Sequence, residues 1–97
     1  MHLPARTLEL AGELDMATAP LVSEGADPLV GSDGDIKIDL GEVTFLDSSG
    51  IAALLGVGRA LAGRGRVLLV RPRPNVRRVL QLTGLCGPAG GMAIVES

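Results

Sequence analysis

The most informative segment of this chain is Val43-Thr44-Phe45-Leu46-Asp47-Ser48-Ser49-Gly50-Ile51. An apolar run ends there in an acid and two hydroxyls, directly before residues that repeat at helical spacing. This pattern predicts a strand that leads into the first turn of a helix. The side-chain oxygen of Ser48 is expected to cap the free N–H groups of that turn. Because a helix N-terminus carries partial positive charge, a phosphate is also tolerated there. Ser48 is therefore either a cap alone or a cap that a kinase can reach.

Composition predicts one small domain over residues 1–97 without a metal or cofactor. The chain is 46% hydrophobic but has one aromatic residue, Phe45, so aliphatic side chains must fill the core. It offers no aromatic platform for single-stranded nucleic acid, and its net charge of −2 argues against general binding to nucleic acid or anionic membranes. One His and one Cys exclude a His/Cys metal site.

Charged residues interrupt every long apolar run, so no insertion into a membrane is expected. Residues 1–6 lack the apolar core of a signal peptide. Cys86 cannot form an internal disulfide, which fits a reducing compartment. These features together predict a cytoplasmic protein.

The first part of the chain predicts a strand and a weak helix. Alternation over residues 7–12 indicates a strand that ends at Gly12. Thr18 precedes Ala19-Pro20 and is expected to cap a helix. Gly25 and Pro28 weaken this helix, which is therefore predicted to be short or broken and to end near Pro28.

The remainder alternates between strands and helices. Residues 35–40 predict a strand and Gly41-Glu42 a short break, after which residues 43–46 form a second short apolar piece that leads to the acid-hydroxyl corner. A helix is expected from Ser49 to about Ala62, and residues 66–70 read as a buried parallel strand. A last helix, capped by Asn75 and ended by Gly84, has an inner face predicted to contain Val76, Val79, Leu80 and Leu82.

Residues 92–95 predict a final edge strand. The order of elements is then strand, helix, strand, helix, strand, helix, strand. This order predicts an α/β domain with a central, mostly parallel or mixed sheet of about four strands and helices packed on it.

The chain resembles the STAS domain and, within that family, the bacterial anti-sigma factor antagonists (anti-anti-sigma factors). The resemblance runs from about Thr7 to Leu85 and is carried by four segments in order. These are residues 12–15 with Thr18-Ala19, residues 40–45, residues 46–51, and residues 75–85.

The resemblance implies a phosphoprotein of bacterial transcription regulation that acts by partner switching. In that family the unphosphorylated protein binds an anti-sigma factor that is also a serine kinase, which releases a sigma factor. The kinase then phosphorylates a serine that matches Ser48, and a phosphatase resets the cycle. Ser49 is the second choice of acceptor. The resemblance also implies a partner-binding surface made of Asp15, Thr18, Asp47, Ser48, Ser49 and Gly50.

Alternative roles remain open for these residues. Asp15 and Asp47 could be ordinary turn and strand-end acids, and Ser49 a first-turn helical residue that faces solvent. Arg71, Arg73, Arg77 and Arg78 are interpreted as a solvated face that balances the acids. No enzyme is predicted, because His2 is the one candidate base for Ser48 and lies at the chain end. The functional alternative is a STAS scaffold, or the small cytoplasmic subunit of a signalling complex or lipid-transport ATPase.

The sequence departs from the family pattern at its two ends. Six residues precede Thr7, so the N-terminal edge strand of the family is expected to be short or missing. The closing C-terminal helix of the family has no counterpart, and residues 86–91 are rich in glycine. An exposed sheet edge would favour weak self-association.

Overall fold

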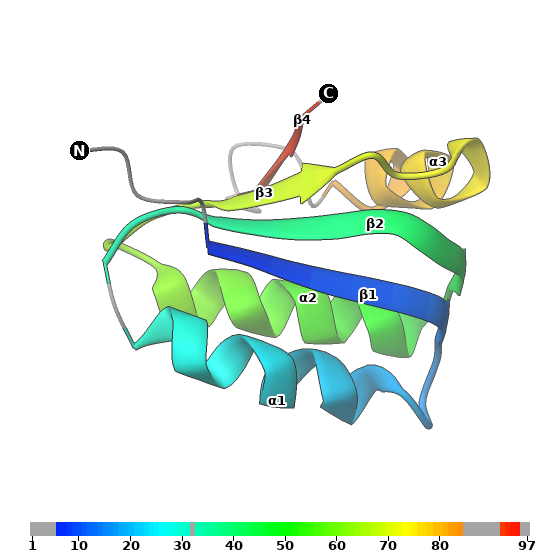
Figure 1. The fold of residues 1–97 in the computed structure, drawn as a ribbon. Coiled ribbons are helices and arrows are strands. Elements are labelled where there is room, and N and C mark those ends of the chain that lie inside the picture. The colour runs from blue at the N-terminus through cyan, green and yellow to red at the C-terminus, as the bar shows by residue number, and fades with distance from the viewer. Residues whose placement is uncertain (1–5, 32, 85–91, 96–97) are drawn as a thin grey trace.

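The computed structural model describes residues 6–31, 33–84 and 92–95 and shows alternating strands and helices (Figure 1). It confirms the predicted order of elements, which are β1 (Arg6–Leu14), α1 (Ala19–Val30), β2 (Ile36–Leu46), α2 (Ser48–Leu61), β3 (Val67–Val70), α3 (Pro74–Thr83) and β4 (Met92–Val95). The predicted α/β class is therefore confirmed.

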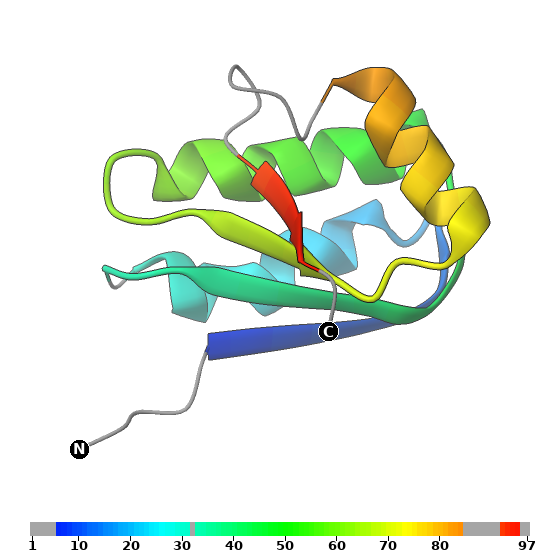
Figure 2. The ribbon, with the colours of Figure 1, turned by 90° about the horizontal axis from the view of Figure 1, so that it is seen from above.

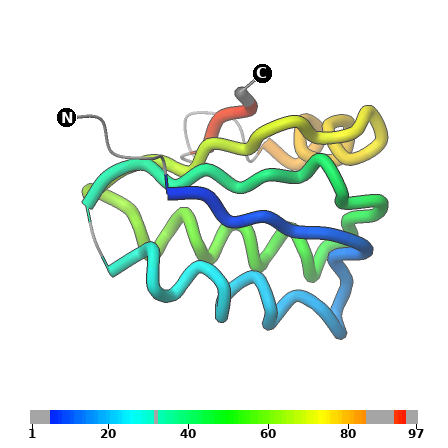
Figure 3. The backbone as a smooth tube through the Cα atoms, in the orientation of Figure 1, coloured from blue at the N-terminus to red at the C-terminus, as the bar shows by residue number. Residues whose placement is uncertain are grey.

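The four strands form one parallel sheet in the order β1-β2-β3-β4. Helices α1 and α2 lie side by side against one face of this sheet, as Figures 1 and 2 both show. Helix α3 lies apart from this pair, beyond the carboxyl end of β3 (Figure 2). The path of the chain from α2 through β3 to α3 is followed most easily in Figure 3. In the described part of the chain, β1 and β4 are the two edges of the sheet.

The predicted break at Gly41-Glu42 is wrong, because β2 runs through it as one strand. The interruption is a β-bulge instead: Glu9 pairs with Asp39, but Ala11 pairs with Glu42, so β2 has one extra residue between these two pairs. Burial changes phase at this point, from Ile36, Ile38 and Leu40 to Val43 and Leu46. A bulge keeps the two strands paired but changes which of the following side chains face the core. In the sequence, this change interrupts the alternation of apolar and polar residues and therefore resembles the end of a strand.

Strand β1 also runs further than predicted. Gly12 does not end it but has a φ of +78° at a second register irregularity, and β1 continues to Leu14. Leu14 is only 3% exposed. Glycine tolerates this left-handed backbone without strain, so pairing with β2 resumes beyond it.

Helix α1 is continuous from Ala19 to Val30, and the prediction of a short or broken helix is wrong. Pro28 lies inside its last turn, where the missing N–H removes one hydrogen bond near the end of the helix. Val22 and Ala26 are buried and hold the helix on the sheet. Gly25 permits this approach, since a Cβ there would lie 2.8 Å from Cδ1 of Leu8.

Helix α3 ends at Gly84, as predicted, with a φ of +75°. The prediction that Asn75 caps it is wrong: the N-cap residue is Arg73, and Asn75 Nδ2 donates to the Thr44 carbonyl at 3.0 Å. The inner face of α3 contains Val76, Leu80 and the partly buried Val79, but not Leu82, which is 77% exposed. The strand at residues 92–95 is confirmed, whereas Cys86 and the rest of residues 86–91 lie outside the described residues.

The core is aliphatic, as the composition requires. The core residues come from all seven elements, and the largest fully buried side chains are Ile36, Ile38, Leu40, Leu54, Leu61, Leu69, Leu80, Val22, Val43, Val67 and Val76. Phe45 is not among them and remains 45% exposed. Burial of each Leu, Ile or Val is worth about 1.5–3 kcal/mol.

The start of α2 packs directly on the ends of β1 and β2 through Gly50. A Cβ at this position would lie 2.6 Å from the Leu14 carbonyl oxygen and 2.6 Å from Cδ1 of Leu46. The first of these contacts is with backbone, which cannot move aside as a flexible side chain can. Glycine at position 50 therefore sets how closely the helix approaches the sheet.

Two of the four predicted surface arginines are paired with acids of β2. Arg71 lies 2.7 Å from Asp39, and Arg73 lies 3.6 Å from Glu42. The hydrogen bond from Arg71, followed by one from the Gly41 amide, lowers the pKa of Asp39 below its ordinary value of 3.8. These pairs support the interpretation of the arginines as a face that balances acids, and they attach the β3–α3 loop to the bulge of β2.

We predict that Gly50→Ala destabilises the protein, although alanine is normally the better helix residue. The new Cβ would overlap backbone, and overpacking of this kind costs about 1–3 kcal/mol. The matched control is Gly56→Ala in the same helix, where a Cβ meets nothing within 4 Å and should stabilise by about 0.5–1 kcal/mol. Urea unfolding measures both variants, and equal stabilities would contradict the close approach.

We also predict a specific acid dependence from Asp39. Because its folded-state pKa is lowered, its contribution is complete above pH 3.8 and is lost as the pH falls from there through the lowered value. The stability difference between wild type and Asp39→Asn should therefore shrink below about pH 4. Urea unfolding as a function of pH tests this, with Asp27→Asn on the exposed side of α1 as the control. A difference independent of pH would contradict the assignment.

Candidate functional site

The two acidic corners of the sequence meet at one edge of the sheet. Leu14 and Leu46, the last residues of β1 and β2, are paired, so Asp15 and Asp47 leave neighbouring strand ends. The Asp47 amide donates to the Leu14 carbonyl at 3.1 Å, which joins the two corners directly. Parallel strands place their carboxyl ends at the same edge, and α/β proteins commonly carry sites there.

The cap of α2 is Asp47, and the prediction that Ser48 is the cap is wrong. Asp47 has an extended backbone, with φ −108° and ψ −171°, and its Oδ1 accepts from the amides of Ser49 at 2.8 Å and Gly50 at 3.1 Å. The Ile51 amide donates to the Asp47 carbonyl at 3.0 Å. Aspartate is as good a cap as serine and adds a negative charge at the positive end of the helix.

Ser48 is consequently the first residue of α2 and is exposed to solvent. Within the described residues its hydroxyl has no hydrogen-bond partner, and the fold does not require it for capping. A group attached to this oxygen would enter solvent rather than the core. This geometry leaves Ser48 accessible to another protein.

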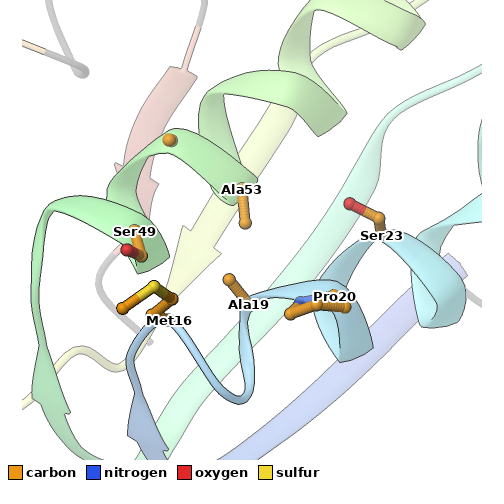
Figure 4. Close-up of a pocket in the computed structure, with 7 residues that line it drawn as sticks. Met16, Ala19, Pro20, Ser23, Ser49 and Ala53 are labelled. Atoms are coloured by element: carbon orange, nitrogen blue, oxygen red, sulfur yellow. The ribbon is translucent and has the colours of Figure 1, made fainter.

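Ser49 and Gly50 face different surroundings from Ser48. Ser49 is partly buried and, together with Met16, contributes to the lining of a groove between α1 and α2 (Figure 4). Gly50 is buried beneath the first turn. Of the two serines, Ser48 is therefore the more exposed, and Gly50 shapes the site through packing.

Asp15 and Thr18 stabilise the loop that enters α1. Asp15 Oδ1 accepts from the amides of Ala17 at 3.0 Å and Thr18 at 3.1 Å. Thr18 Oγ1 accepts from the Asp15 amide at 2.9 Å and donates to the Glu13 carbonyl at 2.6 Å. Thr18 occupies the predicted N-cap position but makes no side-chain cap bond, so the prediction of a capping bond is wrong. Its hydroxyl is already used by the backbone that precedes the helix.

Reasoning from the sequence assigned no role to Met16, which is 79% exposed beside the Asp15 loop. Met16 lines the groove with Ala19, Pro20 and Ser23 of α1 and with residues of α2. The available signal was a large apolar side chain in a polar corner between a strand and a helix. Contiguous exposed apolar surface is a common feature of protein interaction sites.

The described part of the chain contains no group of three or more His, Cys, Asp or Glu side chains able to hold a metal ion. None of its described helices is long and apolar enough to cross a membrane.

Comparison with known proteins identifies the family. A family model described as "Mlab, STAS domain" matches residues 2–96. The anti-sigma-B factor antagonist of Bacillus subtilis is 30% identical over 79 residues, which cover 80% of this chain and 72% of that protein. The anti-sigma F factor antagonist of Lysinibacillus sphaericus is 36% identical over 84 residues, which cover 84% of this chain and 71% of that protein.

Solved structures of similar proteins share the fold. An anti-sigma factor antagonist from Mycobacterium paratuberculosis has a TM-score of 0.77 and 31% identity, over 90% of this chain and 74% of that one. The Bacillus cell fate determinant SpoIIAA in its phosphorylated form has a TM-score of 0.65 and 30% identity, over 92% and 80%. Together with the family model, these similarities show that the chain belongs to the STAS domain family and, within it, to the anti-sigma factor antagonists.

Proposed function

We propose that this chain binds an anti-sigma factor with serine kinase activity while Ser48 is unphosphorylated, and that phosphorylation of Ser48 ends this binding. A sigma factor would be released in the first state and recaptured in the second. The observation that carries the proposal is the exposed Ser48 hydroxyl, next to a helix cap that is made by Asp47. One similar structure is that of the Bacillus cell fate determinant SpoIIAA in its phosphorylated form, which supports the use of phosphate as the switch.

Phosphorylation would change the surface more than the fold. A phosphate adds about −1.5 to −2 charges at neutral pH. On Ser48 it would lie beside the Asp47 carboxylate and near the corner of Asp15, so the local negative charge would rise sharply. The N-terminus of α2 partly compensates that charge, and the Asp47 cap bonds do not involve the Ser48 hydroxyl.

In this proposal the protein acts in the cytoplasm, has no catalytic activity of its own, and is reset by a phosphatase. Asp15, Thr18, Asp47 and Ser49 form the surroundings of Ser48 that the kinase would contact, whereas buried Gly50 would act through packing. Direct binding to nucleic acid is not part of the proposal, since Arg71 and Arg73 are paired with acids.

Incubation with the host anti-sigma factor kinase and ATP should add one phosphate to the wild-type chain. Ser48→Ala should abolish this modification, whereas the matched variant Ser49→Ala should retain it, because Ser48 is the exposed hydroxyl of the pair. Mass spectrometry of the intact protein and of its peptides provides the measurement. Modification of Ser49, or of neither serine, would overturn the assignment of the acceptor.

A Ser48→Asp variant should capture the anti-sigma factor from the host at least about tenfold less well than Ser48→Ala, a loss of about 1.4 kcal/mol in binding. Its free energy of unfolding should stay within about 0.5 kcal/mol of the wild-type value, as for other exposed substitutions. Quantitative pull-down and urea unfolding measure the two quantities. A different result would favour the alternative role as a STAS scaffold. Both variants would then capture the anti-sigma factor equally well, and transporter or scaffold subunits would co-purify with them whether or not ATP is present.

A further inference from the structure

An open groove of about 420 Å³ lies between α1 and α2. Its walls are formed by Met16, Ala19, Pro20, Ser23, Ser49, Ala52 and Ala53. Figure 4 shows that Ala19 and Ala53 point toward one another across the groove, and that Met16 and Ser49 lie together at one end.

The chemistry of the groove favours an apolar occupant. Its lining contains no charged side chain, and its only polar side chains are the hydroxyls of Ser23 and Ser49. Met16, at one end, is 79% exposed. Covering such a lining with an apolar group is favourable, because apolar surface is removed from water. A polar group would find few hydrogen-bond partners there.

The groove is continuous with the proposed phosphoacceptor site. Ser49, in its wall, directly follows Ser48 on the first turn of α2. A kinase that reaches the Ser48 hydroxyl must cover this turn, and it therefore comes within reach of the groove entrance at Met16 and Ser49.

We propose that this groove receives an apolar side chain of the anti-sigma factor partner, and that it provides affinity separately from the switch at Ser48. The inference rests on the proposed function, because the partner is the kinase that acts on Ser48. The groove would bind the partner by burying apolar surface of both proteins. The charge at Ser48 would separately decide whether the surfaces around Ser48 and on the kinase are complementary.

Ala52→Glu tests this proposal, since it introduces a long charged side chain into the groove wall. The dissociation constant for the purified host anti-sigma factor kinase, measured by calorimetry without ATP, should rise at least about tenfold. The matched control is Ala60→Glu, which is exposed on the same helix and outside the groove lining, and should change the constant by less than about twofold.

A second matched pair tests a groove residue that lies outside the helices. Met16→Ser should weaken binding, whereas Leu82→Ser should not, although the two side chains are 79% and 77% exposed. Circular dichroism verifies that each variant is folded.

The outcomes separate this inference from the proposed function. If the wild-type chain binds the kinase and both groove variants bind equally well, the groove proposal is overturned while the function stands. If the wild-type chain fails to bind, the proposed function itself fails. If Ala52→Glu alters self-association in sedimentation experiments but not kinase binding, the occupant is a second copy of this chain, which also overturns the proposal.

Discussion

The site depends on one interaction: the Asp47 carboxylate accepts the first free amides of α2. The first amides of a helix have no partner within the helix and need an acceptor from elsewhere. Because the aspartate meets this need, the neighbouring Ser48 hydroxyl has no structural duty and faces solvent. Capping and solvent exposure, which the sequence pattern assigned to one side chain, are divided between Asp47 and Ser48.

The cap is held in place by the sheet beneath it. The Asp47 amide donates to the Leu14 carbonyl, and Gly50 brings the first turn of α2 within van der Waals contact of the same strand end. The position of Ser48 is therefore fixed by the pairing of β1 with β2 rather than by a flexible loop. A support of this kind suits the proposed switch, in which phosphorylation would change the charge of the surface and leave the fold intact.

Much of the fold could be predicted from local patterns. The order of the seven elements and the αL end of α3 at Gly84 follow from apolar periodicity and glycine, which act over a few residues. Errors occurred where pairing across the sheet decided the outcome. The bulge at Gly41 and the left-handed Gly12 both keep β1 and β2 paired through points that look like strand ends, and packing of Val22 and Ala26 carries α1 through Pro28.

The sequence by itself determined the family resemblance, the apolar composition of the core and the short segment 47–50 that contains the proposed acceptor. The tertiary structure alone decided which side chain caps α2, how deeply each residue of that segment is buried, and that α1 and α2 leave a groove beside it. The physical reason is the separation along the chain over which each effect acts. Propensity and periodicity act between neighbours along the chain, whereas the extended backbone of Asp47 and the groove both depend on contacts between segments about 30 residues apart.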